Sequence, residues 1–199
     1  MFEWPKTLAC FGHSLKNLGH ENILKFCPNR KFKTIDDHDE AYIENHNALV
    51  SENDIVVSLG DFAFRNKRPI KEYINALNGK IFIIFGNHDK SALMDRNLFA
   101  GSWGRLGHNE VVEYKWNKEK YVLCHYPMLS WSRRAHGSIH MFGHVHSNLN
   151  ERSFTCQQNS CDVGVDAWNH SPVLIEDAIN RAKSMEGKLR VLDKYDNSV

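Results

Sequence analysis

Short apolar runs alternate along this chain with segments whose apolar positions recur at helical spacing. Runs rich in β-branched and aromatic residues predict strands at residues 7–11, 54–59, 80–85, 110–116, 120–125 and 138–142. Helical spacing predicts a short helix and three longer ones, at residues 21–26, 34–50, 69–77 and 172–183. We expect residues 91–107 to be irregular. The strand, helix and strand between residues 54 and 85 form a βαβ unit, so the pattern predicts an α/β (α+β) fold.

Length and charge add two constraints. The chain has 199 residues, of which 42% are hydrophobic and 25% charged, and we expect residues 1–199 to form one globular domain, with residues 187–199 as a loosely ordered polar tail. The 25 Lys and Arg residues nearly balance the 24 Asp and Glu residues. No overall field therefore draws the protein to nucleic acid or to an acidic membrane, and any polyanion binding has to be local.

The apolar runs also bear on location. The run at residues 7–11 is too short for a signal peptide, and no segment reaches the roughly 20 apolar residues of a membrane-spanning helix. We therefore predict a soluble, cytoplasmic protein that does not bind membranes. Five cysteines without a C-x-x-C pair argue against a disulfide framework and a thiolate zinc site, so we expect reduced thiols.

Four of the apolar runs end in compact clusters of metal-ligand side chains, namely Gly60-Asp61, Gly86-Asn87-His88-Asp89, Cys124-His125-Tyr126-Pro127 and Gly143-His144-Val145-His146. Because the carboxyl ends of neighbouring strands are close in space, we expect one carboxylate, one amide oxygen and three imidazoles to converge there. This mixed set suits manganese, iron, zinc or nickel better than calcium or magnesium. Two such ions about 3.5–4 Å apart can hold a phosphate and supply a nucleophile.

These clusters, in this order and spacing, resemble the signature of the calcineurin-like metallophosphoesterase family. The segments 18–23, 59–64 and 162–168 resemble its small bacterial and phage-type members. The resemblance implies a four-layer β-sandwich with helices on both faces, and a phosphomonoesterase or phosphodiesterase that uses a metal-activated hydroxide. It also implies roles for six residues: Asp61 bridges two metals, Asn87, His125 and His144 complete one site, His146 belongs to the other, and His88 contacts the phosphate and aids the leaving group.

The first motif of that family, Asp-x-His followed by a residue and Gly-His, is altered here. In the matching register, Leu15 and Asn17 stand at the two ligand positions. Leucine cannot bind a metal, and an asparagine oxygen is a weaker ligand than imidazole for these ions. A second register, with Gly12-His13 as the Gly-His element, also lacks the aspartate. Asn17, His13 and His20 are candidate substitute ligands, and both one ion and two ions stay open.

Two other functions remain as alternatives. A phosphoesterase fold that has lost catalysis can act as a metal-binding or phosphate-binding module. A nuclease can use the same metal site, but it needs a basic groove, for which the candidates are Lys67, Arg68, Arg133 and Arg134. The substrate is therefore a small phosphate ester or a nucleic acid, and the oligomeric state is open.

Several further polar residues are more ambiguous. We expect Asp89 to be structural and His140, which lies in the middle of a strand, to be packed. Asp162 and Asp166 either cap turns or contact a ligand histidine.

Overall fold

The computed structural model describes residues 10–11, 17–65, 68–89, 104–108, 111–146 and 158–185, with side chains for all but 10–11 and 104–108. Its strands are β1 (Cys10–Phe11), β2 (Ile55–Ser58), β3 (Lys80–Phe85), β4 (Gly104–His108), β5 (Val112–Trp116), β6 (Glu119–Leu123), β7 (Ile139–Phe142), β8 (Ser160–Asp162) and β9 (Val173–Leu174). Its helices are α1 (Ile23–Phe26), α2 (Ile35–Leu49), α3 (Ile70–Ala76) and α4 (Ile175–Ser184), with 3₁₀ turns at Arg134–His136 and Val165–Ala167.

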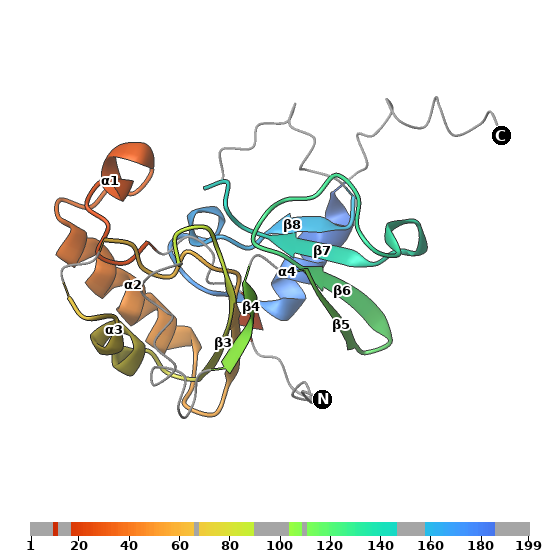
Figure 1. Ribbon diagram of the computed structural model, residues 1–199, viewed down its shortest axis with the longest axis horizontal. Coiled ribbons are helices and arrows are strands. Elements are labelled where there is room, and N and C mark those ends of the chain that lie inside the picture. Colours follow the sequence, from red (N-terminus) through yellow and green to blue (C-terminus); the bar gives the residue numbers. More distant parts are fainter. Residues whose placement is uncertain are drawn as a thin grey trace.

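The strands form two sheets (Figure 1). The first has the order β4-β3-β2-β1-β9, in which β1 to β4 are parallel and β9 is antiparallel to β1. The second has the order β5-β6-β7-β8, in which only the β5–β6 pair is antiparallel. Strands β2, β3, β6 and β7 therefore each end beside a parallel neighbour, as the four ligand clusters require.

Two local structures stabilise elements that the sequence predicts. Thr34 and Asp37 form a capping box at the start of α2, in which each side chain accepts a hydrogen bond of 3.1 Å from the other residue's backbone N–H. The β5–β6 hairpin turns through Asn117 and Lys118, with φ of 48° and 68°. Positive φ at both positions is the geometry of a type I′ turn, whose twist matches that of the strands.

Two predictions of local structure were wrong, and strand β8 was not predicted. Residues 104–108, which we expected to be irregular, form β4 and pair with β3. This strand contains two glycines and its pairing has a register shift, so it carries no apolar run that would predict it. Strand β8 has only 3 residues, too few to form a recognisable apolar run. Val173 and Leu174 pair with β1, so α4 begins at Ile175 rather than near residue 172.

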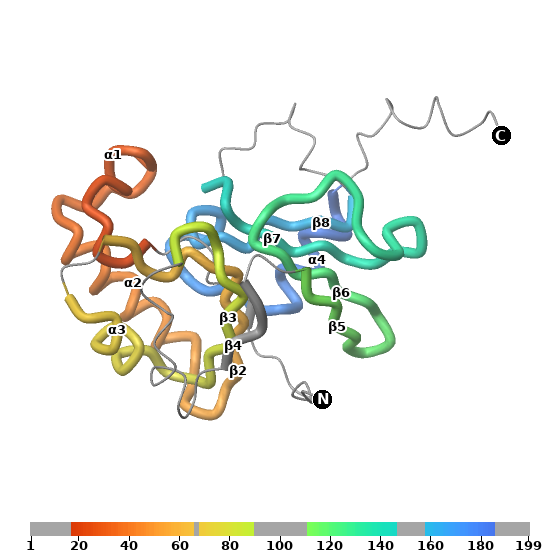
Figure 2. Tube along the Cα trace, viewed as in Figure 1, coloured from red at the N-terminus to blue at the C-terminus, as the bar shows by residue number. Residues whose placement is uncertain are grey.

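Two hydrophobic clusters cover the two faces of the first sheet. Val56 and Ile83 pack with α2 and α3, whereas their neighbours Val57 and Ile84 pack with the second sheet and α4. Figure 2 shows the same arrangement, with α2 and α3 on one side of β2 and β3 and the second sheet on the other. Both faces of β3 are thus buried, as its continuous apolar run predicts.

The mixed α/β class is confirmed, whereas the four-layer sandwich with helices on both faces stays a prediction. The outer face of the second sheet is covered in part by Trp131, which stacks near His140 with ring centroids 5.2 Å apart. The single-domain boundary also stays a prediction, and residues 187–199 lie outside the described residues. No helix in the described segments has both the length and the apolar character that crossing a membrane requires.

Candidate metal centre

Asp61 lies in a tight turn that follows β2. Its backbone has a φ of 53°, and the preceding Gly60 has a φ of 94°. A Cβ on Gly60 would collide with the backbone of Gly86, which lies in the turn after β3. A Cβ on Gly86 would lie 2.6 Å from His125 Cε1 and still closer to Asp61 Oδ1. The two glycines therefore let the strand ends approach closely enough to bring the polar side chains together.

Three predicted ligands converge on a fourth, at the Nε2 atom of His125. That nitrogen lies 3.0 Å from Asn87 Oδ1, 3.2 Å from His144 Nδ1 and 3.5 Å from Asp61 Oδ2. Ligand atoms of Asp61, His125 and His144 all lie within 4.8 Å of one another. We call these four side chains the Asp61 cluster.

The protons in the Asp61 cluster can be assigned from its hydrogen bonds. His125 Nδ1 lies 2.6 Å from the carbonyl oxygen of Leu59, which can only accept, so Nδ1 carries the proton. Burial lowers the pKa of His125, which favours the neutral ring with an unprotonated Nε2. The Nε2 lone pair then faces the oxygens of Asn87 and Asp61, which are also acceptors. A cation placed among them would satisfy all these lone pairs, so the donor set fits a divalent ion.

Asp89 holds the two turns in place. This fully buried carboxylate accepts backbone N–H bonds from Asp61 and Gly86 through Oδ2, both at 2.7 Å, and from Phe62 through Oδ1 at 2.8 Å. Asp61 Oδ1 in turn accepts from the backbone N–H of His88 at 2.9 Å. Asp89 therefore acts on the site through the backbone, as its structural interpretation predicts.

His146 belongs to a different group. Its Nδ1 lies 2.8 Å from Asp166 Oδ2, and ligand atoms of Cys27, His146 and Asp166 all lie within 4.8 Å of one another. Burial disfavours the charged imidazole, but hydrogen bonds to Asp166 and Cys27 outweigh it and raise the pKa of His146 to about 9. We call these three side chains the Asp166 cluster. Of the two interpretations of Asp166, the contact with a candidate ligand histidine is the one observed.

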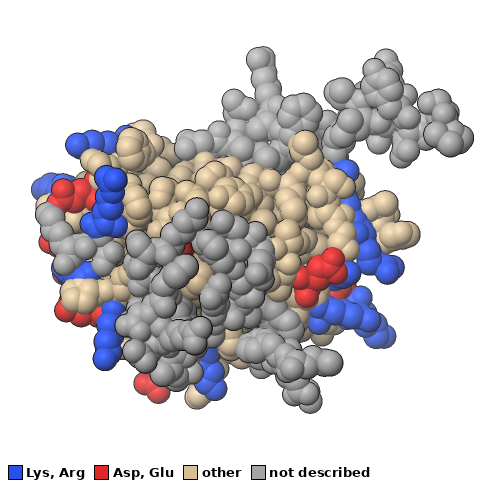
Figure 3. Space-filling view, in the orientation of Figure 1, with Lys and Arg blue, Asp and Glu red and all other residues tan. Residues whose placement is uncertain are grey.

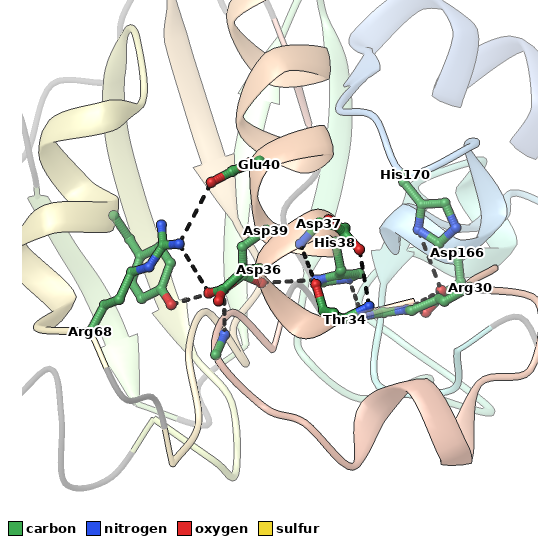
Figure 4. A network of polar contacts seen from close by, with 12 residues as sticks. Arg30, Thr34, Asp36, Asp37, His38, Asp39, Glu40, Arg68, Asp166 and His170 are labelled. Atoms are coloured by element: carbon green, nitrogen blue, oxygen red, sulfur yellow. Dashed lines mark hydrogen bonds and ion pairs between the residues drawn. The ribbon is translucent and has the colours of Figure 1, made fainter. Parts of the chain in front are cut away.

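A buried ionic network connects the Asp166 cluster to α2 and α3 (Figure 4). Arg30, which is 2% exposed, donates two bonds of 2.7 Å to the two oxygens of Asp166. Its third nitrogen lies 2.9 Å from His38 Nε2, and His38 Nδ1 lies 2.9 Å from Asp39 Oδ1. Asp39 Oδ2 accepts from the hydroxyl of Tyr73 at 2.8 Å. Burial disfavours the charged form of Asp166, yet the hydrogen bonds from Arg30 and His146 hold the pKa of that carboxyl well below its usual range.

The candidate substitute ligands are placed differently. Asn17 is buried, with a φ of 49°, and its backbone N–H donates to the Asp61 carbonyl oxygen at 3.1 Å. Asn17, His20, His88 and His146 all line one cavity of about 350 Å³. Asn17 and His20 therefore lie near the Asp61 cluster, His20 is not among the residues whose ligand atoms gather there, and His13 lies outside the described residues.

Other candidate residues have structural roles. His140 is fully buried between the Val122 carbonyl, 2.9 Å from its Nδ1, and the Met128 N–H, 3.2 Å from its Nε2, and burial lowers its pKa to about 4. It is a packed histidine, as predicted. Among the arginines considered for a basic groove, Arg68 pairs with Asp36 at 2.9 Å and with Glu40 at 3.6 Å.

The remaining basic candidates do not surround the Asp61 cluster. Arg133 lines a cavity with Lys115, Lys118 and Lys120, at the end of β6 opposite to His125. Arg134 lies over the ring of Trp131, and Lys67 lies outside the described residues. In Figure 3 most of the described basic residues visible on this face lie towards the two ends of the molecule.

Two known proteins are similar in sequence to this chain, and the name of neither states an activity. No family model matches the chain. The chain is 34% identical over 164 residues to the uncharacterized protein MJ1445 of Methanocaldococcus jannaschii. The matched region covers 80% of this chain and 83% of that protein. The chain is also 28% identical over 158 residues to the Gene 66 protein of Mycobacterium phage D29, and the matched region covers 67% of this chain and 77% of the phage protein.

Two solved structures resemble the chain to different degrees. The protein of unknown function AQ665 from Aquifex aeolicus matches with a TM-score of 0.64 and 20% identity, over 84% of this chain and 95% of that one, and so shares its fold. The Pseudomonas putida nuclease MPE matches over only 54% of this chain and 52% of its own, with a TM-score of 0.38 and 23% identity, too low to show a common fold.

Proposed function

The chain belongs to the family of the uncharacterized protein MJ1445, and from the geometry of its site we propose that it is a metal-dependent phosphoesterase of the calcineurin-like type. The observation that carries this proposal is the convergence of Asp61, Asn87 and His144 on Nε2 of His125. Lone pairs that face one another in a buried site are costly unless a cation or proton lies among them.

The residues of this site have distinct tasks in the proposed reaction. The Asp61 cluster would hold a divalent ion, which would supply Lewis acidity toward a phosphoryl oxygen. The Leu59 carbonyl fixes the ring of His125, and Asp89 fixes the turn that carries Asp61. His88 adjoins the cluster, through the bond from its backbone N–H to Asp61, and its imidazole is the group that we assign to protonate the leaving oxygen.

We further propose that one ion binds, in the Asp61 cluster. A second ion in the Asp166 cluster would have to compete with Arg30, whose guanidinium already takes both oxygens of Asp166. It would also have to displace the proton that Asp166 and Cys27 stabilise on His146. Asn17 stands where the family motif has a histidine, and its side chain is a weak substitute.

The test is hydrolysis of p-nitrophenyl phosphate and bis-p-nitrophenyl phosphate by the manganese-loaded protein. We expect manganese-dependent turnover of at least one ester, and loss of that turnover in Asp61→Ala with the circular dichroism spectrum unchanged. The matched control is His136→Ala, because His136 is exposed and lies outside the cluster. Full activity in Asp61→Ala would refute the proposal.

A second candidate, a binding module without turnover, is favoured by one observation. The segment that should supply the first metal site offers a buried asparagine, and His146 is paired with Asp166 instead. Under this alternative the protein binds manganese and inorganic phosphate but hydrolyses neither ester. Phosphate binding that needs the metal, combined with absent turnover, would therefore replace the enzyme proposal with this one.

A further inference from the structure

A cavity of about 350 Å³ opens beside the Asp61 cluster. His88 links the two, because its side chain lines the cavity and its backbone N–H donates to Asp61 Oδ1 at 2.9 Å. The volume is at the lower end of the roughly 300–1,000 Å³ that small-molecule pockets occupy. A phosphate held by the cluster would therefore have the cavity beside it.

The walls of the cavity are aromatic and cationic. The ring of Phe64 is fixed on several sides: the His88 ring lies 4.3 Å away, the His20 ring contacts it edge-on at 4.9 Å, and the Arg65 guanidinium lies 5.2 Å from its centroid. Phe26, at the end of α1, has 67% of its surface exposed and lines the same cavity. One aromatic ring is thus held by the protein, and a second is open to a ligand.

Two residues of the cavity wall have left-handed backbone conformations. Asn17 and Arg65 both line it with φ near 50°, a region that costs free energy for residues with a side chain. Arg65 is exposed and lines the cavity, with its guanidinium over the ring of Phe64. Its guanidinium can pair with an anionic oxygen of a ligand that stacks on Phe26.

We propose that this cavity binds the organic group of the substrate, and that this group is a flat aromatic or heterocyclic ring carried on the phosphate. Phe26 stacks on the ring, and Arg65 neutralises charge on the phosphate. The inference rests on the proposed function, because it needs the phosphate to be held by the Asp61 cluster. It defines the substrate class as aryl or heterocyclic phosphate esters rather than alkyl or sugar phosphates without such a ring.

The experiment compares phenylphosphonate with methylphosphonate, two non-hydrolysable ligands that differ only in the ring. Their affinities for the manganese-loaded protein are measured by calorimetric titration. Stacking on one aromatic side chain predicts about a tenfold preference for the phenyl compound. Phe26→Ala should abolish that preference and Phe26→Tyr should keep it. Arg65→Ala should weaken both ligands by a similar factor, about tenfold for a lost charged hydrogen bond.

The matched control is Leu49→Ala, which removes another exposed apolar side chain, at the end of α2 and outside the cavity. It should leave the preference intact. Equal binding of the two phosphonates by the unmodified protein, or an unchanged preference in Phe26→Ala, would overturn this inference alone. Failure of both phosphonates to bind, together with absent turnover, would overturn the proposed function and this inference with it.

Discussion

The two clusters of ligand-type side chains differ in how their lone pairs are used. In the Asp61 cluster, a histidine nitrogen faces two oxygens and a second imidazole nitrogen. In the Asp166 cluster, Arg30 donates to both carboxylate oxygens, and the imidazole of His146 completes the ion pair. The first group offers lone pairs that a cation could bind, whereas the carboxylate of the second is already paired with Arg30 and His146. Proximity of ligand atoms alone therefore does not identify a metal site.

The largest effect should come from removing Arg30, the cation that pairs with the Asp166 cluster. Arg30→Met leaves the buried Asp166 carboxylate with His146 alone as its counterion and leaves His38 Nε2 without its donor, which we expect to lower the free energy of unfolding by about 3–5 kcal/mol. Urea denaturation followed by circular dichroism measures this. Arg181→Met is the control, because Arg181 lies on the surface, where it donates to the Ala167 carbonyl and lies over the ring of Trp168. Equal losses in the two variants would show that Arg30 is not the internal cation of this cluster.

The next effect concerns catalysis in the Asp61 cluster. His88→Ala removes the imidazole assigned to proton transfer and keeps the backbone N–H that binds Asp61. We expect kcat to fall about 100-fold, a typical contribution of general acid catalysis, while the manganese content stays unchanged. Steady-state kinetics and elemental analysis measure the two quantities. Loss of manganese in this variant would mean that His88 is a ligand rather than the proton donor.

Sequence patterns predicted the contacts of the Asp61 cluster but not the buried ion pairs. Asp61, Asn87, His125 and His144 each follow an apolar run, so the sheet topology that the runs predict also predicts their meeting. Arg30 and Asp166 are 136 residues apart and follow no periodic pattern, so no feature of a single sequence pairs them.

A weaker signal was present for the rest of the network. Asp39, Tyr42 and His46 recur at helical spacing and all face the interior from α2. A carboxylate on the apolar face of a predicted helix indicates a buried partner, although it does not say which one. Strand β4 was missed for a related reason: its hydrogen bonds to β3 come from the backbone, and its glycines leave no side-chain pattern.

A smaller effect is the pH dependence of stability in the metal-free protein. Asp166 and Cys27 raise the pKa of His146 to about 9 from an ordinary value of 6.5. The folded state therefore holds a proton that the unfolded chain releases, so this contribution is complete below pH 6.5 and is lost as the pH rises through 9. We expect the free energy of unfolding to fall by about 1–3 kcal/mol over that range.

The measurement is urea denaturation at pH 6, 8 and 9.5 in the presence of a chelator. His146→Gln, which keeps a hydrogen-bond donor without the titrating ring, should flatten the profile. An unmodified protein whose stability is constant or rises across this range would contradict the assignment.

The smallest effect tests the sulfur of the Asp166 cluster. Cys27→Ser removes the thiol and keeps a small polar side chain, so we expect the manganese content to stay the same and the free energy of unfolding to change by less than about 1 kcal/mol. Elemental analysis and urea denaturation check both. A loss of bound ion in Cys27→Ser would show that the Asp166 cluster does hold a metal.

The central claim is that one divalent ion binds, and that it binds in the Asp61 cluster. The most direct test is elemental analysis of protein that has been equilibrated with manganese and separated from free ions by gel filtration. We predict one ion per chain in the unmodified protein and none in His144→Ala. Two ions per chain, with one retained in His144→Ala, would contradict the account.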